Sequence, residues 1–101
     1  MTTVRWTLQA VDDLRSIRLF IERDSPRYAR LVVERLFEAV TRIEKFPRSG
    51  RVVPELDRLD IRELIVGEYR IVYQLEESVA HVVTVFRSSR LLPWAPQDDS
   101  E

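Results

Sequence analysis

Apolar residues recur every three or four positions in the first half of the chain, and this spacing predicts two helices. The first covers 8–23, and Thr7 precedes it as an N-cap. The second covers 26–46, where Ser25 is placed to cap the helix and Pro26 fits its first turn. Each helix has one apolar stripe and the link between them is short. The pair is therefore expected to form a helical hairpin that buries both stripes.

Beyond a loop at 47–56 the apolar period changes from about 3.6 to 2, which indicates strands. Gly67-Glu68 and Glu77-Ser78 separate three of these strands as two-residue hairpin loops. The prediction is an α+β fold of order β-α-α-β-β-β, in which the helical hairpin packs on one face of an antiparallel sheet. The predicted strands are 4–6, 61–66, 69–76 and 79–86.

The hairpin loops imply a strand register, and the register sorts the side chains between the two faces of the sheet. It places Val72 opposite Val83 on one face and Phe86 on the other, helix-covered face. No further element remains to cover the face with Val72, which we call the outer face, so we predict an exposed partner-binding surface there. Two alternatives stay open: the segment 91–94 folds back over this face, or two copies of the chain pair there. The predicted partner-binding residues are Ile65, Arg70, Val72, Gln74, His81, Val83, Val85 and Arg87.

Composition and charge limit the class of protein. The 101 residues carry 16 basic and 17 acidic side chains, a net charge of −1. This balance argues against bulk binding of nucleic acid, which uses many phosphate contacts, although a local basic patch is compatible with it. There is no cysteine, no secretory signal and no apolar run near the ~20 residues of a membrane helix, so we expect a cytoplasmic protein without membrane contact. One domain is expected over 1–92, with a frayed acidic tail at 93–101.

Few residues could carry chemistry. His81 is the one histidine, there is no glycine-rich phosphate loop, and no acidic cluster has metal-site spacing, so no cofactor and no metal are expected. The register brings Arg70 and Arg87 to one rim of the outer face, where guanidinium groups could hold RNA phosphates or the acids of a protein partner. Alternatively, Arg62 and Arg70 belong to a structural ion-pair network with Glu55, Glu63 or Glu68.

The layout resembles the RelE/ParE superfamily of toxins from bacterial type II toxin–antitoxin modules, over nearly the whole chain from Trp6 to about Leu92. The ParE-like branch is favoured by the turn that ends in Gly50-Arg51, by Pro54-Glu55-Leu56 and by Ile61-Arg62-Glu63-Leu64. Further residues that carry the resemblance are Trp6-Thr7, Asp13-Leu14, Ile17, Pro47, Tyr69-Arg70-Ile71-Val72-Tyr73 and Val85-Phe86-Arg87-Ser88-Ser89-Arg90.

The resemblance implies different activities for the two branches. RelE-like toxins cleave mRNA on the ribosome without a metal, and here Arg70, Arg87 and Arg90 would be the catalytic residues. In that branch lysines are wanted in the second strand, where this chain has Ile61 and Glu63.

ParE-like toxins instead bind and inhibit DNA gyrase, are not enzymes, and are neutralised by a cognate antitoxin whose disordered half folds along the helical hairpin and sheet. In this reading the target-binding residues are Arg87, Arg90, Leu91 and Trp94, and operator DNA is bound only through the antitoxin. A third possibility is a non-toxic module that binds an antitoxin.

Overall fold

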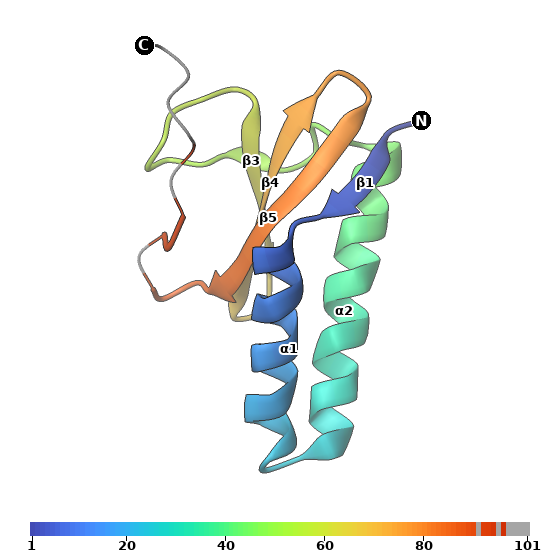
Figure 1. Ribbon diagram of the computed structural model, residues 1–101, viewed down its shortest axis with the longest axis vertical. Helices are drawn as coiled ribbons and strands as arrows, with labels where there is room; N and C mark the ends of the chain where they lie inside the picture. Colours follow the sequence, from blue (N-terminus) through green and yellow to red (C-terminus); the bar gives the residue numbers. More distant parts are fainter. Residues whose placement is uncertain (91, 95, 97–101) are drawn as a thin grey trace.

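A five-stranded mixed sheet carries the helical hairpin on one face (Figure 1). The computed structural model describes residues 1–90, 92–94 and 96. The strand order across the sheet is β1-β5-β4-β3-β2, and the predicted α+β architecture is confirmed. The elements in chain order are β1 (Thr3–Trp6), α1 (Leu8–Glu22), α2 (Pro26–Lys45), β2 (Arg51–Val52), β3 (Ile61–Val66), β4 (Tyr69–Glu76) and β5 (Val79–Arg87).

Side-chain caps begin both helices at the predicted residues. The Thr7 hydroxyl accepts a hydrogen bond from the Ala10 N–H at 3.1 Å, and the Ser25 hydroxyl accepts one from the Tyr28 N–H at 3.1 Å. Each cap satisfies a backbone donor that has no partner within the first turn of its helix. The caps therefore fix where the two helices start: α1 begins just after β1, and α2 begins just after the short link between the helices.

The sequence had predicted an antiparallel sheet, but one pair of strands in it is parallel. β1 runs parallel to β5, with Thr3 opposite Val79 and Trp6 opposite Val82. The remaining strand pairs are antiparallel. The loop at 47–56 also contains an unpredicted strand, β2, which pairs with Arg62 and Glu63 of β3. Both differences arise from pairing between segments distant in sequence, which local patterns do not report.

Both two-residue hairpin loops are confirmed, but the predicted register holds only up to the middle of β5. Gln74 lies opposite His81 as expected, whereas Val72 lies opposite Thr84 instead of Val83. A bulge between Val72 and Tyr73 causes this shift by leaving one extra residue in β5. Because side chains alternate between faces, the shift moves Val85 into the helix-side core and moves Phe86 to the opposite face.

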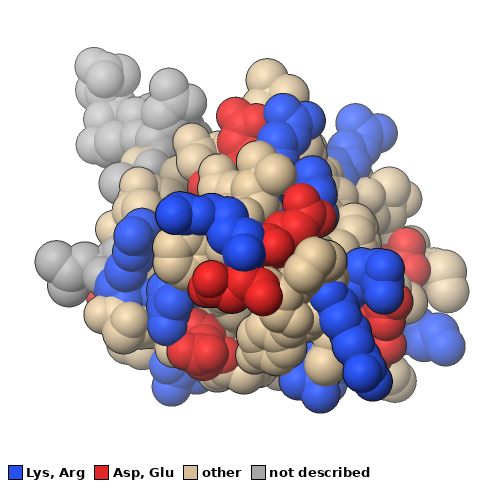
Figure 2. All heavy atoms as spheres, turned by 90° about the horizontal axis from the view of Figure 1, so that it is seen from below, with Lys and Arg blue, Asp and Glu red and all other residues tan. Residues whose placement is uncertain are grey.

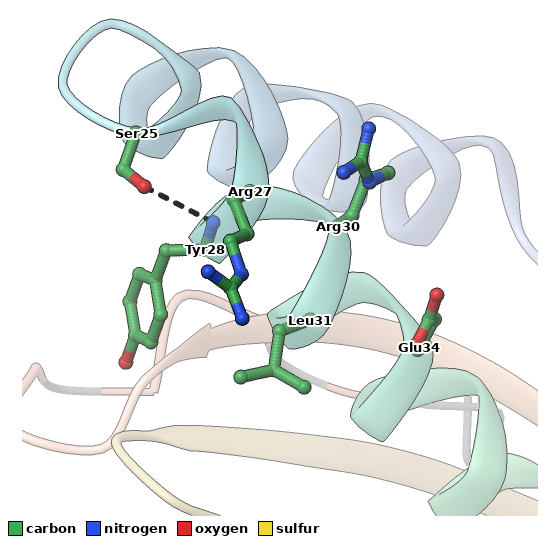
Figure 3. A pocket seen from close by; sticks show the side chains of 6 residues that line it. All are labelled: Ser25, Arg27, Tyr28, Arg30, Leu31 and Glu34. Carbon is green, nitrogen blue, oxygen red and sulfur yellow. Dashed lines mark hydrogen bonds between the residues drawn. The ribbon is translucent and has the colours of Figure 1, made fainter.

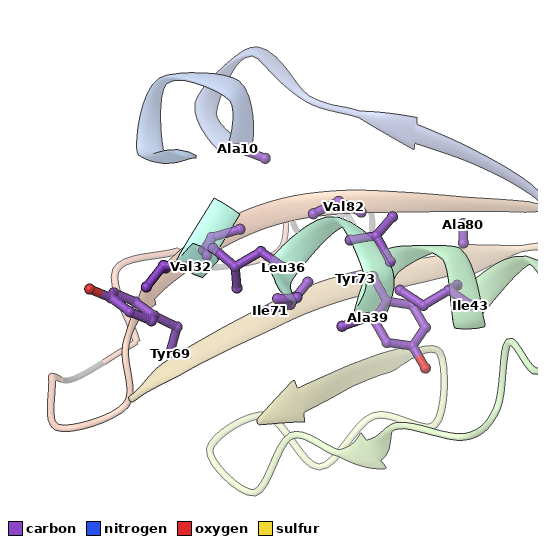
Figure 4. Close-up of a cluster of buried hydrophobic side chains, with 12 residues drawn as sticks. Ala10, Val32, Leu36, Ala39, Ile43, Tyr69, Ile71, Tyr73, Ala80 and Val82 are labelled. Carbon is purple, nitrogen blue, oxygen red and sulfur yellow. The ribbon is translucent and has the colours of Figure 1, made fainter. Parts of the chain in front are cut away.

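The main core lies between the hairpin and the sheet (Figure 4). Leu36 and Ile43 of α2 pack there with Ile71 and Tyr73 of β4, and all of them are fully buried. The Tyr73 hydroxyl donates a hydrogen bond to the Pro47 carbonyl at 2.7 Å and accepts one from the Gly50 N–H at 3.0 Å. These two bonds tie the loop that follows α2 to the centre of the sheet.

A second, smaller core, here called the outer core, covers the opposite face of the sheet. The prediction that this outer face is exposed is therefore wrong. Val53, Ile61 and Val72 are fully buried there, and Val83 and Phe86 are nearly so. The cover comes from the loop before β3, through Val53 and Leu56, and from the C-terminal segment, through Leu92 and Trp94. This agrees with the alternative in which the C-terminal segment folds back. Leu91 and most of the predicted tail lie outside the described residues.

Candidate partner-binding surfaces

Arg70 is the centre of an ion-pair network at the edge of the outer face. Its guanidinium donates to Glu55 through Nη1 and Nη2, both at 3.0 Å, and to Glu63 through Nε at 2.8 Å and through Nη2. Arg51 donates to the other oxygen of Glu63. The Arg70 guanidinium also lies 5.0 Å from the centre of the Phe86 ring. This arrangement confirms the predicted ion-pair network for Arg70. The prediction is wrong for Arg62, whose guanidinium donates to the backbone carbonyls of Arg48, Gly50 and Leu59.

The network is largely removed from water. The Glu63 side chain is fully buried and the Arg70 side chain is 8% exposed, whereas Glu55 is 40% exposed. Hydrogen bonds from Arg70 lower the pKa of Glu55, and hydrogen bonds to Glu55 and Glu63 raise the pKa of Arg70. Glu55 and Arg70 therefore stay charged over the physiological pH range. Arg70 already has carboxylate partners in the positions that a phosphate would take.

Arg87 and Arg90 border a groove of about 560 Å³ between α1 and the end of β5. Arg87 is exposed and donates to Glu68 at 2.8 Å, and Phe20 of α1 presents a ring that is 58% exposed to the same groove. Other lining residues are Gln9, Asp13, Ser16, Ile17, Tyr69, Val85, Phe86 and Pro93. The groove combines guanidinium groups with exposed apolar surface, which is the composition of protein-binding sites.

A second groove, about 250 Å³, lies on the hairpin between the two helices. Val11 of α1 is 41% exposed, and Phe37 of α2 is 47% exposed and packs its ring 5.4 Å from that of Trp6. Arg15 and Arg18 border this apolar floor, together with Leu14 and Val33. Exposed apolar side chains in a groove between two helices suit the apolar face of a third helix.

The structure separates the residues that the sequence had predicted as one partner-binding surface. Ile65 and Arg87 are exposed, whereas Arg70, Val72, Val83 and Val85 are buried. Gln74 donates to Asp60 at 3.1 Å and His81 lies 2.9 Å from a Glu76 oxygen, both half-buried. The expected exposure of the valines is therefore wrong, because the loop before β3 and the C-terminal segment cover them. Their role in partner binding stays a prediction.

The predicted target-binding residues also divide. Arg87 and Arg90 meet at the groove beside α1, whereas Trp94 packs against the outer core. Leu91 lies outside the described residues.

The sequence analysis missed the groove between the helices, because the helical periodicity located the buried stripes but not the apolar residues left over beside them. Val11 and Phe37 carried the signal, since both lie at the margin of their stripes.

Two negative findings concern the described part of the chain. No helix there is long and apolar enough to cross a membrane. Within the same residues, His, Asp and Glu side chains form no group of three or more that could hold a metal ion.

Residues 4–92 match the model of the family described as the ParE toxin of the type II toxin–antitoxin system parDE. The chain belongs to the ParE toxin family. Toxin RelE2 of Caulobacter vibrioides is a relative that is 34% identical over 92 residues, which are 90% of this chain and all of that protein.

Solved structures agree with the ParE family fold. The chromosomal ParDE system of P. aeruginosa aligns with a TM-score of 0.71 at 19% identity, covering 86% of this chain and 96% of that chain. A mutant of E. coli toxin RelE in the free state aligns with a TM-score of 0.63 at 18% identity, covering 87% and 84%. Both ParE and RelE therefore share the architecture of Figure 1.

Proposed function

We propose that this protein is the toxin of a type II toxin–antitoxin module, that it inhibits DNA gyrase in the cytoplasm by binding it, and that a cognate antitoxin neutralises it. Membership of the ParE family supports the toxin assignment. The choice between gyrase and mRNA as the target depends on which arginines are free to act.

The state of Arg70 carries the proposal. Ribonuclease chemistry needs cationic side chains that can stabilise the charge developing on a phosphate. Arg70 donates to two carboxylates and is nearly buried, so a phosphate would have to displace Glu55 or Glu63. In β3, the positions where the ribonuclease branch would have lysine hold Ile61 and the buried Glu63. An arginine held in this way stabilises the fold, and inhibition by protein binding then needs no catalytic group.

The groove beside α1 is the proposed contact with gyrase. It joins Arg87, Arg90 and the exposed ring of Phe20, so it offers hydrogen bonds to acidic side chains next to an apolar anchor. Trp94 is left with a structural role in this arrangement, since it packs on the outer core rather than into the groove.

The antitoxin is proposed to cover the groove between the helices. An amphipathic segment that folds on binding could place apolar side chains on Val11 and Phe37 and acidic ones beside Arg15 and Arg18. Solved relatives include a ParDE toxin–antitoxin system, which supports an antitoxin partner for this chain.

The target is tested by adding the purified protein to a gyrase supercoiling reaction and, in parallel, to a cell-free translation reaction. We expect loss of supercoiling with translation intact. The variant Arg87→Ala/Arg90→Ala should weaken the inhibition by at least about tenfold. Its matched control is Arg5→Ala/Arg48→Ala, which removes two exposed arginines outside the groove and should inhibit as the parent does. Arrested translation with cut mRNA would make the protein a ribonuclease instead.

The antitoxin surface needs its own measurement. Val11→Glu/Phe37→Glu is expected to weaken the affinity for the co-expressed antitoxin by at least about tenfold, because it puts charge on the apolar floor of the groove. Leu19→Glu is the control, since Leu19 is 48% exposed on α1 but does not line the groove. Equal affinity of both variants would place the antitoxin elsewhere. Binding of the antitoxin without inhibition of gyrase or translation would indicate the non-toxic module.

A further inference from the structure

Within the described residues, four arginines of the sheet and its loops pair with a carboxylate, whereas one arginine of the hairpin does. In the sheet and its loops, Arg51, Arg58, Arg70 and Arg87 each lie within ion-pair distance of a carboxylate. Within the described residues, the sole ion pair of the two helices is Arg18 with Glu22, at 2.9 Å. The other hairpin arginines have no carboxylate within 4 Å in this part of the chain: Arg15, Arg23, Arg27, Arg30, Arg35 and Arg42. The hairpin as a whole, residues 8–45, carries eight basic and seven acidic side chains, so its positive charge matters only where the arginines are concentrated.

This charge is densest around the link between the helices. Residues 15–31 contain five arginines and two acids, a local charge of +3 in a chain whose total is −1. We call this segment the hairpin end. It protrudes beyond the sheet in Figure 1. Figure 2 views the molecule from this side and shows Lys and Arg side chains on several sides of a few central acids. The field of these cations would steer an anionic partner toward the hairpin end.

Aromatic side chains accompany the arginines at the hairpin end. The Arg23 guanidinium lies 6.0 Å from the centre of the exposed Phe20 ring. On the first turns of α2, Arg27, Tyr28 and Arg30 border a shallow hollow of about 350 Å³ (Figure 3). In that view the Arg27 guanidinium lies between Tyr28 and Leu31, whereas the Arg30 side chain points away from them. The guanidinium donors thus spread around the helix instead of converging on one point, which suits a ligand that carries many anionic groups.

We propose that the hairpin end binds the phosphate backbone of duplex DNA while the antitoxin holds the protein at its operator. The planar fork of arginine matches the oxygens of a phosphate group. A protein partner would need a desolvated apolar centre ringed by charge, and that arrangement occurs instead at the two grooves, one beside α1 and one between the helices. The proposal rests on the proposed function, because a complex with a DNA-bound antitoxin supplies the high local concentration that a chain of net charge −1 needs.

The contact is weak in the isolated chain and strong when tethered. A small number of phosphate contacts gives low affinity at physiological salt and a shallow salt dependence. Once the antitoxin has bound its own site, the same contacts form within one complex and lower the dissociation rate from DNA. The toxin would then tighten binding to the operator through its own arginines, in addition to any effect on the shape of the antitoxin.

The test measures the anisotropy of a fluorescein-labelled duplex of about 20 base pairs with the protein alone, from about 20 to about 200 mM NaCl. The key variant is Arg23→Gln/Arg27→Gln/Arg30→Gln. Its matched control, Arg5→Gln/Arg42→Gln/Arg48→Gln, removes three exposed arginines without a carboxylate partner in the described residues, and so changes the net charge equally. All six substituted arginines are exposed, and glutamine keeps nearly the helix propensity of arginine at the three positions in α2, so both variants should fold, and circular dichroism checks this.

We expect the hairpin-end variant to lower the affinity by at least about tenfold at low salt and to reduce the slope of log K against log [salt] by about 2 to 3. The control should stay within about twofold of the parent. An equal loss in both variants would reduce the effect to net charge and overturn the proposal. So would no binding by the parent at the lowest salt, or a preference for single-stranded RNA over the duplex. Unchanged DNA binding with weakened antitoxin or gyrase binding would make the hairpin end a protein-binding surface.

The DNA assay contains neither gyrase nor antitoxin. Its failure would leave the gyrase proposal standing, and failure of the supercoiling assay would leave the measured DNA contact standing. The consequence for regulation is then checked with the co-purified toxin–antitoxin complex on its own operator fragment. The hairpin-end variant should raise the dissociation rate of that complex from DNA several-fold, and an unchanged rate would overturn the role in operator binding.

Discussion

The carboxylate of Asp13 on α1 accepts a hydrogen bond from the Thr84 hydroxyl on β5 at 2.6 Å. The same oxygen accepts the backbone N–H of Val85 at 3.1 Å. β1 pairs with β5 only as far as Val82, so the last residues of β5 have no strand partner on that edge. Asp13 takes the place of a strand there and holds the first helix against the end of β5, next to the proposed gyrase groove.

Removal of the Asp13 carboxylate should destabilise the protein. Asp13→Ala leaves the Val85 N–H and the buried Thr84 hydroxyl without their partner, which is expected to lower the free energy of unfolding by about 1–3 kcal/mol. Urea unfolding followed by circular dichroism measures this loss. Asp12→Ala is the matched control, because Asp12 is exposed on the same helix. Similar midpoints for the two variants would contradict a structural role for Asp13.

Arg70 is expected to matter for stability rather than for chemistry. Arg70→Met leaves Glu63 buried without its main partner, which should lower the free energy of unfolding by about 3–5 kcal/mol. The double variant Arg70→Met/Glu63→Leu removes both charges and should recover part of that loss. Arg87→Met breaks an exposed pair and should cost less than about 1 kcal/mol. Thermal unfolding of the three variants decides the point: a fully stable Arg70→Met that has lost activity would argue for catalysis.

Gly50 is required by a close approach of the backbone to Tyr73. A Cβ at this position would lie 2.6 Å from the Tyr73 hydroxyl oxygen and 2.7 Å from the Glu63 carbonyl oxygen. Gly50→Ala should therefore lower the free energy of unfolding by about 1–3 kcal/mol. Tyr73→Phe removes the hydroxyl and should soften this clash, so the cost of alanine at position 50 should be smaller in that background. Additive losses in the double variant would contradict the contact.

Acid should weaken the fold in part through Glu55. Hydrogen bonds from Arg70 lower the pKa of Glu55 below its usual value of 4.5. The unfolded carboxyl then binds its proton at a higher pH than the folded one. The contribution of Glu55 to the free energy of unfolding is therefore present above pH 4.5. It is lost as the pH falls through the pKa of this carboxyl in the folded protein.

Glu55→Gln should accordingly make stability depend less steeply on pH as the pH falls below 4.5. Urea unfolding at a series of pH values measures the slope. Glu38→Gln serves as the control, since Glu38 is exposed and has no ion pair in the described residues. The proposed linkage fails if the Glu55 variant keeps the slope of the parent.

Trp94 should contribute to folding through the outer core. Trp94→Ala removes apolar surface from the cluster around Phe86 and Val72, and a loss of about 1–2 kcal/mol is expected in urea unfolding. Pro93→Ala, at an exposed neighbour, should change little. Toxicity lost on truncation of this segment would therefore report unfolding as well as target binding, and point variants at Arg87 and Arg90 give the clearer test. A Trp94 variant as stable as the parent would contradict the packing role.

The candidate sites were only partly visible in the sequence. Arg87 and Arg90 were predicted near one rim, and they do border one groove. The ion-pair partners of Arg70 were predicted as an alternative and are observed. The prediction that the outer face is exposed was wrong, because Val53, Leu56 and Trp94 cover this face. Apolar residues in a loop or near a chain end have no periodicity that would indicate which surface they bury.

The sequence by itself determined the local elements of this protein. The helical spacing with the Thr7 and Ser25 caps located α1 and α2, and two-residue loops at Gly67 and Glu77 located the antiparallel hairpins. Each of these signals depends on residues within a few positions of one another, whose preferences act in any surroundings.

Only the tertiary structure decided the direction of β1, the bulge opposite Val72 and the cover of the outer face. These features follow from contacts between distant segments, such as β1 with β5 or Trp94 with the outer core. From Val82 to Phe86 four of the five residues are apolar, so alternation could not reveal that one of them is extra. The packing of two cores on a single sheet selected the arrangement, because the apolar side chains of β5 from Ala80 to Phe86 are then all buried.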